Sequence, residues 1–232
     1  SASLQQLGRT SESVEVDTRL LDVMSTQGNK ENLAGVCLRL GHSNLALEEW
    51  STALKYFQKS RIYAPTDSRS LKGIIECSWQ KGEYSRVAQL CSTLVKNATD
   101  EQDVILGYLW RGFTLDAKLQ RQELAEQHYW RVLEYDQNHY ATLIYLSGIS
   151  FQKGKYKSML GQLNQVWGQE GHSATLTQLV AVGRYIAANE LGEDETKDEM
   201  SDWLESNEVA FGDSDNAGEQ WRIQLTERLF GI

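Results

Sequence analysis

Residues 80–91 read Gln-Lys-Gly-Glu-Tyr-Ser-Arg-Val-Ala-Gln-Leu-Cys, and residues 152–163 read Gln-Lys-Gly-Lys-Tyr-Lys-Ser-Met-Leu-Gly-Gln-Leu. In both stretches an aromatic residue stands two positions after a glycine. Two apolar residues four positions apart then follow, Val87 and Cys91 in the first stretch and Met159 and Leu163 in the second. The second half of this pattern recurs without the glycine at 53–57 and 125–129. Such internal repeats decide the fold, because each repeat forms one structural unit that packs on the next.

The pattern divides the middle of the chain into four units, 34–67, 68–101, 106–139 and 140–173. Residues 102–105 lie between the second and third units, and we expect the first helix of the third unit to begin within them. Each unit has a position for a small residue where two helices cross closely, and a partner four residues later lies on the same helix face. The residues at this crossing position are Ala53, Val87, Ala125 and Met159. Met159 is larger than the others, which predicts looser or shifted packing in the fourth unit.

Two glycines mark the turn between the helices of a unit. Gly82 and Gly154 can adopt the left-handed conformation that ends a helix. Glu48 and Gln120 occupy the same register in the first and third units, so the form of those two turns is left open by the pattern.

The repeats resemble the tetratricopeptide repeat (TPR) family over roughly 140 of the 232 residues. The residues that carry this resemblance are Leu40, Gly41, Ala53, Phe57 and Pro65 in the first unit, Gly82, Tyr84 and Leu94 in the second, Ala125, Tyr129 and Val132 in the third, and Leu146, Gly154, Tyr156 and Val166 in the fourth. The resemblance implies an all-α fold, a right-handed α-solenoid of stacked helical hairpins. The near absence of proline, which occurs only at Pro65, also favours long helices over a turn-rich β-sandwich.

The flanking segments are less regular and are expected to cap the array. Residues 1–33 are predicted to form an N-terminal cap, with a helix over 11–27. Residues 174–232 are predicted to form a C-terminal helical cap, with a helix after the fourth unit, further helices over 198–205 and 219–230, and a loop over 211–218. Residues 190–219 carry twelve acids and one base, Lys197. This acidic segment is interpreted as a solvated helix face with its loop, or as a segment that folds back into the groove of the array.

Composition excludes several classes of protein. The net charge is −9 and 41% of the residues are apolar, which argues against nucleic-acid binding and against disorder. No signal peptide or membrane-spanning run is present in the sequence given, and the start without Met fits a piece of a longer protein. Cys37, Cys77 and Cys91 match no metal or redox motif and are predicted to be buried core residues. This cysteine usage suits a reducing compartment, and we expect a cytoplasmic protein.

No pattern of catalytic or cofactor-binding residues is found. The four histidines are scattered, and there is no phosphate-binding glycine loop, nucleophile elbow or zinc-protease motif. We therefore expect no enzyme activity, no cofactor and no metal, although an enzyme that uses the repeats to recruit its substrate is a rival interpretation.

The TPR resemblance implies that the first helix of each unit lines a concave groove. The positions that would face this groove gather basic and aromatic side chains, and the candidate peptide-binding residues are Arg39, His42, Arg69, Lys72, Trp79, Trp110, Arg111, Lys118, Tyr145 and Phe151. Against these bases the groove positions hold one acid, Glu76. The predicted ligand is an acidic peptide or protein segment with large apolar anchors. Two alternatives stay open: the tryptophans could pack between neighbouring helices or under the C-terminal helices, and the acidic segment could neutralise the bases.

The predicted function is a TPR scaffold or adaptor, a protein–protein interaction module within a multiprotein assembly. A dedicated secretion- or pilus-assembly chaperone and a regulatory or assembly domain of a larger protein are the alternatives. Family members that bind chaperone tails carry a Lys/Asn clamp, and Leu38 and His42 stand at those positions here, so that activity is not expected. Self-association through an exposed end of the array is also possible.

Overall fold

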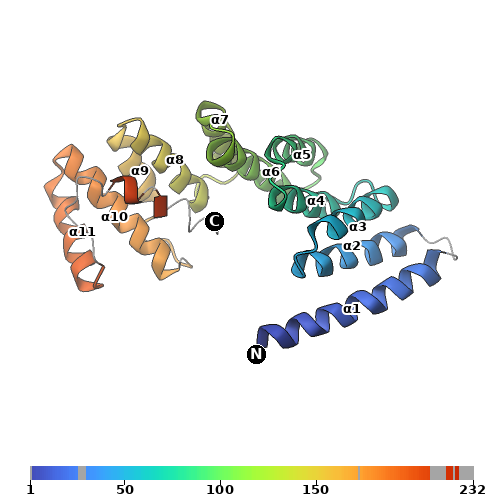
Figure 1. Cartoon of the computed structure of the whole chain (residues 1–232). Coiled ribbons are helices and arrows are strands. Elements are labelled where there is room, and N and C mark those ends of the chain that lie inside the picture. The colour runs from blue at the N-terminus through green and yellow to red at the C-terminus, as the bar shows by residue number, and fades with distance from the viewer. Residues whose placement is uncertain (1, 26–29, 172, 210–217, 222, 225–232) are drawn as a thin grey trace. The chain divides into compact units, whose positions relative to one another are not determined.

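The computed structural model describes the chain except for residues 1, 26–29, 172, 210–217, 222 and 225–232 (Figure 1). The described residues form helices and turns and contain no strand. They fall into two compact units, each larger than the repeats discussed above. These are here called unit 1 (residues 1–119) and unit 2 (residues 120–232). Each unit is described by itself.

Unit 1 is a run of helices in which each helix packs on the next one in sequence. Its elements are α1 (Ala2–Ser25), α2 (Lys30–Ala46), α3 (Trp50–Tyr63), α4 (Ser68–Gln80), α5 (Tyr84–Asn97), α6 (Glu101–Phe113) and a π-helical turn, η1 (Thr114–Lys118). Helix α6 begins at Glu101, before the third repeat and one residue earlier than the predicted start within 102–105. The side chain of Asp100 caps this start by accepting a hydrogen bond from the Asp103 amide at 2.8 Å.

Unit 2 continues the same arrangement. Its elements are α7 (Gln122–Tyr135), α8 (Tyr140–Gln152), α9 (Tyr156–Val166), α10 (Ala174–Leu191) and α11 (Asp194–Ser206). Neighbours in sequence again pack on each other. The helix predicted over 198–205 is part of α11, whereas most of the predicted loop at 211–218 and much of the helix predicted over 219–230 lie outside the described residues.

The crossing positions read from the sequence are confirmed as the seams of the array. Their side chains are all 0% exposed, and so are the residues four positions later; the eight residues are Ala53, Val87, Ala125 and Met159, with Phe57, Cys91, Tyr129 and Leu163. Met159 is as fully buried as the smaller residues at its position.

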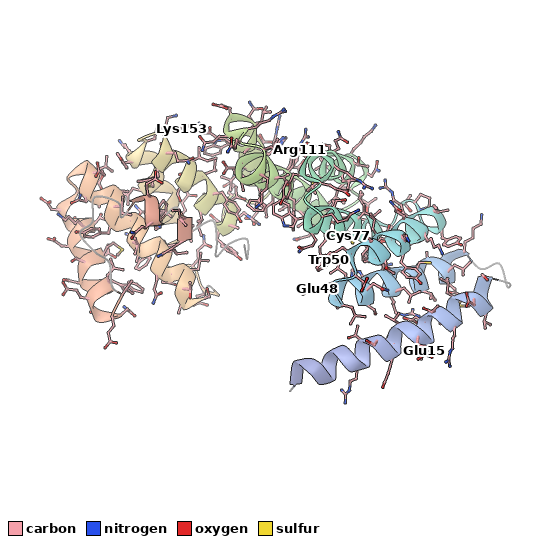
Figure 2. All side chains as sticks on the ribbon, viewed as in Figure 1. Glu15, Glu48, Trp50, Cys77, Arg111 and Lys153 are labelled. Carbon is pink, nitrogen blue, oxygen red and sulfur yellow. The ribbon has the colours of Figure 1, made fainter. Side chains whose placement is uncertain are left out.

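The turns between the paired helices share one backbone conformation. Gly82 and Gly154 have φ values of 72° and 63°, as predicted. Glu48 and Gln120, at the same register, also adopt the left-handed region, with φ values of 61° and 53°. Glu48 and Trp50, labelled in Figure 2, stand where α2 gives way to α3. A residue other than glycine has a strained backbone in this region. The packing of the two helices therefore fixes the turn conformation even where the residue type does not favour it.

The all-α solenoid class predicted from the repeats is confirmed. The three cysteines are free and buried, as expected. Among the helices whose residues are described, none has both the length and the apolar character needed to cross a bilayer.

Candidate functional site

The predicted basic residues of unit 1 lie on the first helices, but two of them are held by carboxylates on neighbouring helices. Arg39 of α2 donates to Asp17 of α1 at 2.6 Å, and Lys72 of α4 donates to Asp103 of α6 at 2.7 Å. The acid is the buried partner in each pair: the Asp17 and Asp103 side chains are 10% and 3% exposed. Both basic side chains remain partly exposed to solvent, while the buried aspartates largely balance their charges.

Arg69 is balanced even more locally. Its guanidinium forms a two-pronged ion pair with Asp67, which also caps the N-terminus of α4 by accepting from the Arg69 amide at 3.0 Å. The Arg69 side chain holds the pKa of the Asp67 carboxyl below its usual range, mainly through these hydrogen bonds. Arg69 is therefore paired at the start of its own helix, while its side chain stays 67% exposed.

His42 and Glu76 lie on the neighbouring first helices α2 and α4. His42 is exposed on α2, and its ring meets the edge of Phe57 at 5.0 Å between centroids. Burial raises the pKa of Glu76 on α4, and the nearby charge of His42 acts in the opposite direction.

These pairs correct the charge balance expected from the sequence. The groove positions contain one acid, Glu76. The structure adds Asp17, Asp67 and Asp103 as ion-pair partners of the bases. All three lie off the repeat positions that face the groove: in the N-terminal helix, at a helix cap, and in the early start of α6. The surface is therefore much less positive than the groove positions alone indicate.

Aromatic side chains gather where α4, α5 and α6 meet. The Trp79 ring lies 5.0 Å from Tyr84, 5.6 Å from Trp110 and 5.0 Å from Phe113, measured between ring centroids. Trp79 and Trp110 are partly buried and rest on the core formed by Leu71, Ile75, Val87, Cys91 and Leu94. The alternative that the tryptophans pack between neighbouring first helices is thus partly realised, and each ring retains some exposed surface.

Two cations of this region, Lys118 and Arg111, have no salt bridge to any described residue. Lys118, at the end of η1, places its Nζ atom 5.5 Å from the centroids of both Trp79 and Tyr84. The π-helical turn, closed by the Leu119 amide donating to the Thr114 carbonyl at 3.1 Å, brings Lys118 to this position. The Arg111 Nε atom is buried and has no hydrogen-bond partner in the described part of the chain.

Arg111 also acts on the core below. Burial raises the pKa of the Cys91 thiol to about 12, against the opposing charge of Arg111. Trp79, Tyr84, Trp110, Phe113, Arg111 and Lys118 are together called the Trp79 surface. Sequence reasoning found Trp79, Trp110, Arg111 and Lys118, but it missed Tyr84 and Phe113, because Tyr84 begins a second helix and Phe113 is largely buried.

The two candidate residues in unit 2 are not available in the way the sequence predicted. Tyr145 is only 7% exposed and stacks on the buried Tyr129 at 5.2 Å, so it belongs to the core. Phe151 meets Trp221 edge to face at 5.8 Å, and Gly218 approaches its ring so closely that a Cβ atom would clash. The covering by C-terminal residues that the sequence left open for the tryptophans is thus found at Phe151 instead.

The described part of the acidic segment belongs to unit 2. Helix α11 packs on α10, and Glu199 lies 3.4 Å from the buried Arg184. Among the described side chains, no group of three or more His, Cys, Asp or Glu could hold a metal ion.

Comparisons with known proteins agree with this fold. No protein-family profile and no curated protein matches the sequence. Solved structures do match: BtubC (BKLC) from P. vanneervenii is 12% identical over 89% of this chain and 91% of its own, with a TM-score of 0.66. PilF from Pseudomonas aeruginosa is 12% identical over 93% and 99% of the two chains, at 0.61. YrrB, a TPR protein with an unusual peptide-binding site, is 13% identical over 91% and 98%, at 0.58. The chain therefore has the fold of the tetratricopeptide-repeat proteins, as its repeats predict.

Proposed function

We propose that this chain is a non-enzymatic protein–protein interaction module, an adaptor or scaffold that binds a segment of a partner protein at the Trp79 surface. One observation carries the proposal: partly exposed indole rings stand next to Lys118, a cation that no described carboxylate balances. Aromatic side chains and arginine are the residue types that most often anchor protein interfaces.

The chemistry of this surface selects its ligand. A carboxylate of the ligand would pair with Lys118, and an adjacent apolar side chain would pack on the Trp79 and Trp110 rings. Charge would speed association and set orientation, whereas burial of the rings would supply most of the affinity. The ligand is thus an acidic segment with a large apolar anchor, and the outer faces of Arg39 and Lys72 offer weaker, already balanced contacts.

The likeness to YrrB supports this proposal at the level of the fold, since that TPR protein has a peptide-binding site. The alternatives, a dedicated assembly chaperone and a regulatory domain of a larger protein, would use the same kind of surface. They differ in their partners: one stoichiometric subunit that co-purifies with the chain favours the chaperone, and several partners favour the scaffold.

The test starts from peptides selected on the intact chain from a random library, with affinities measured by fluorescence anisotropy. We expect enrichment of acidic peptides with one large apolar residue. Lys118→Glu should weaken their binding about tenfold. Lys96→Glu, an equal charge change at an exposed residue of α5, should leave binding within about twofold. Equal effects of the two variants, or enrichment without acidic residues, would contradict the proposal.

A further inference from the structure

Unit 2 contains a cavity that none of the predicted site residues lines. Its volume is about 250 Å³, and it lies between the turn after α9, the start of α10 and the middle of α11. The side chains and backbone around it are those of Val166, Trp167, Gly168, Gln169, Thr177, Val180 and Trp203. This cavity is here called the Trp167 pocket.

The indole walls of the pocket are fixed by a buried arginine. The Trp167 and Trp203 rings meet edge to face at 5.4 Å, and the guanidinium of Arg184 lies 4.8 Å from the Trp167 centroid. Arg184 is 6% exposed and donates to the Asn164 amide oxygen at 2.7 Å, besides its contact with Glu199. A wall held in this way is preformed, so a ligand does not need to order it.

The size and lining of the pocket select one large apolar side chain. A volume of 250 Å³ is below the range of about 300–1,000 Å³ that is usual for small-molecule sites. The polar side chains in the lining are engaged within the protein: Gln169 donates to the Gln165 carbonyl at 2.6 Å, and Thr177 donates to the Ser173 carbonyl at 3.3 Å. The remaining lining is aromatic and aliphatic, which favours an aromatic or long aliphatic anchor.

The helix that contributes Trp203 to the pocket is acidic. Helix α11 contains six acids and one base, Lys197, and the acids are exposed. At 3.6 residues per turn, Glu195 and Asp202 lie within about 100° of Trp203 around the helix axis, whereas Asp198 and Glu205 lie about 140–160° away. The first pair, here called the near acids, therefore lies on the side of α11 closer to Trp203, and the second pair, the far acids, lies on the side turned away from it.

We propose that the Trp167 pocket is a second docking site, which takes one aromatic or large aliphatic side chain of a basic protein segment. The near acids attract the Lys or Arg residues on either side of that anchor, and the two indoles enclose the anchor itself. This ligand has the opposite charge to the one proposed for the Trp79 surface, so the two sites bind different segments.

The test uses the full chain and a fluorescein-labelled peptide in which one Trp stands between two pairs of Lys residues, with anisotropy as the readout at physiological salt. Saturable binding is expected, and replacement of the peptide Trp by Ala should weaken it about tenfold or more. A peptide of the same length with Glu in place of Lys should not compete. Absence of saturable binding by the Lys-Trp peptide would overturn the proposal.

Matched variants locate the site. Glu195→Lys with Asp202→Lys should weaken binding about tenfold, while Asp198→Lys with Glu205→Lys, the same charge change at the same spacing on the far face, should change it less than about threefold. Thr177→Phe fills the pocket from α10 and should abolish binding, whereas Gln178→Phe, next to it but outside the lining, should not. Circular dichroism verifies that each variant is folded. Equal effects of near and far acids, or full binding by Thr177→Phe, would overturn the proposal.

Discussion

Helices α4 and α8 are the first helices of two repeats built on the same pattern, yet they present different surfaces. In α8 every residue from Thr142 to Ser150 is buried, whereas the buried positions of α4 are interrupted by the partly exposed Lys72, Glu76 and Trp79. The repeat pattern therefore fixes how helices pack, while the residues between the seam positions decide whether a first helix becomes core or surface.

In unit 2 the end of α8 also contacts the protein's own C-terminal residues. Trp221, 2% exposed, donates its indole N–H to the Leu179 carbonyl at 2.7 Å and packs against Phe151. No described helix covers the Trp79 rings in unit 1 in the same way. A repeat array can thus close one face with its own C-terminal residues and keep another available.

Removing this cover should produce the largest effect. Trp221→Ala is expected to lower the free energy of unfolding of unit 2 by about 3–5 kcal/mol, because it leaves a cavity and removes the indole hydrogen bond to the Leu179 carbonyl. Urea denaturation measures this loss, and increased binding of a hydrophobic dye would report exposure of Phe151. Ile223→Ala, at a 49% exposed residue of the same segment, should cost less than about 0.5 kcal/mol.

The next effect sharpens the comparison at the seams of unit 1. A Cβ atom at Gly73 would lie 2.5 Å from the ring of Phe57, which is 0% exposed and has no room to move. Gly73→Ala should therefore destabilise unit 1 by about 2 kcal/mol. Gly35→Ala, in α2 with nothing within 4 Å of the added atom, should instead stabilise by about 0.5–1 kcal/mol. The same sign for both variants in thermal unfolding would contradict this packing.

Breaking the link between α4 and α6 should have a smaller effect. Burial tends to raise the pKa of Asp103, but hydrogen bonds from Lys72 and Ser68 outweigh it and lower the pKa below its ordinary value of 3.8. Lys72→Met should cost about 1–2 kcal/mol at neutral pH, because it leaves a buried carboxylate without its cation.

The pH dependence of this variant provides an independent measurement. A carboxyl whose folded pKa is lowered contributes stability above pH 3.8, and this contribution is lost as the pH falls through the folded pKa. The difference in unfolding free energy between the wild type and Lys72→Met should therefore shrink in acid. A difference that does not change with pH would show that the ion pair is not its source.

The smallest expected effect concerns the turns. Gln120 adopts a φ of 53°, so Gln120→Gly should relieve strain and stabilise by about 0.5–1 kcal/mol. Gly154→Ala, at the same register with a φ of 63° and no atom near the added Cβ, should destabilise by a similar amount. Chemical denaturation of the pair distinguishes backbone strain from packing, because neither change touches a seam.

The fold could be predicted from the sequence because the same pattern of buried residues occurs in each repeat. Every repeat has a crossing residue, such as Ala53 or Val87, and a residue four positions later, such as Phe57 or Cys91. Each of these residues is buried because it lies where helices pack together. The left-handed turns at Glu48 and Gln120 could not be read from their residue types and followed only from the register.

The candidate site was predicted only in part, because its electrostatics depend on residues outside the repeat. Asp17, Asp67 and Asp103 come from an added helix, a cap and an early helix start, and no repeat position identifies them as partners of the groove bases. Phe151 was placed correctly on a first helix, yet the C-terminal residue that covers it lies 70 positions further along the chain. Such long-range contacts are set by tertiary packing, which local patterns do not encode.

The distribution of the thiols gives the molecule a built-in probe of its own opening. All three cysteines lie in unit 1, and burial raises the pKa of Cys77 to about 11 and that of Cys91 to about 12. At neutral pH almost no thiolate is present to react with maleimide or iodoacetamide. Pulsed alkylation read by mass spectrometry would therefore follow the transient unfolding of unit 1 alone. Unit 2 contains no cysteine and would give no signal.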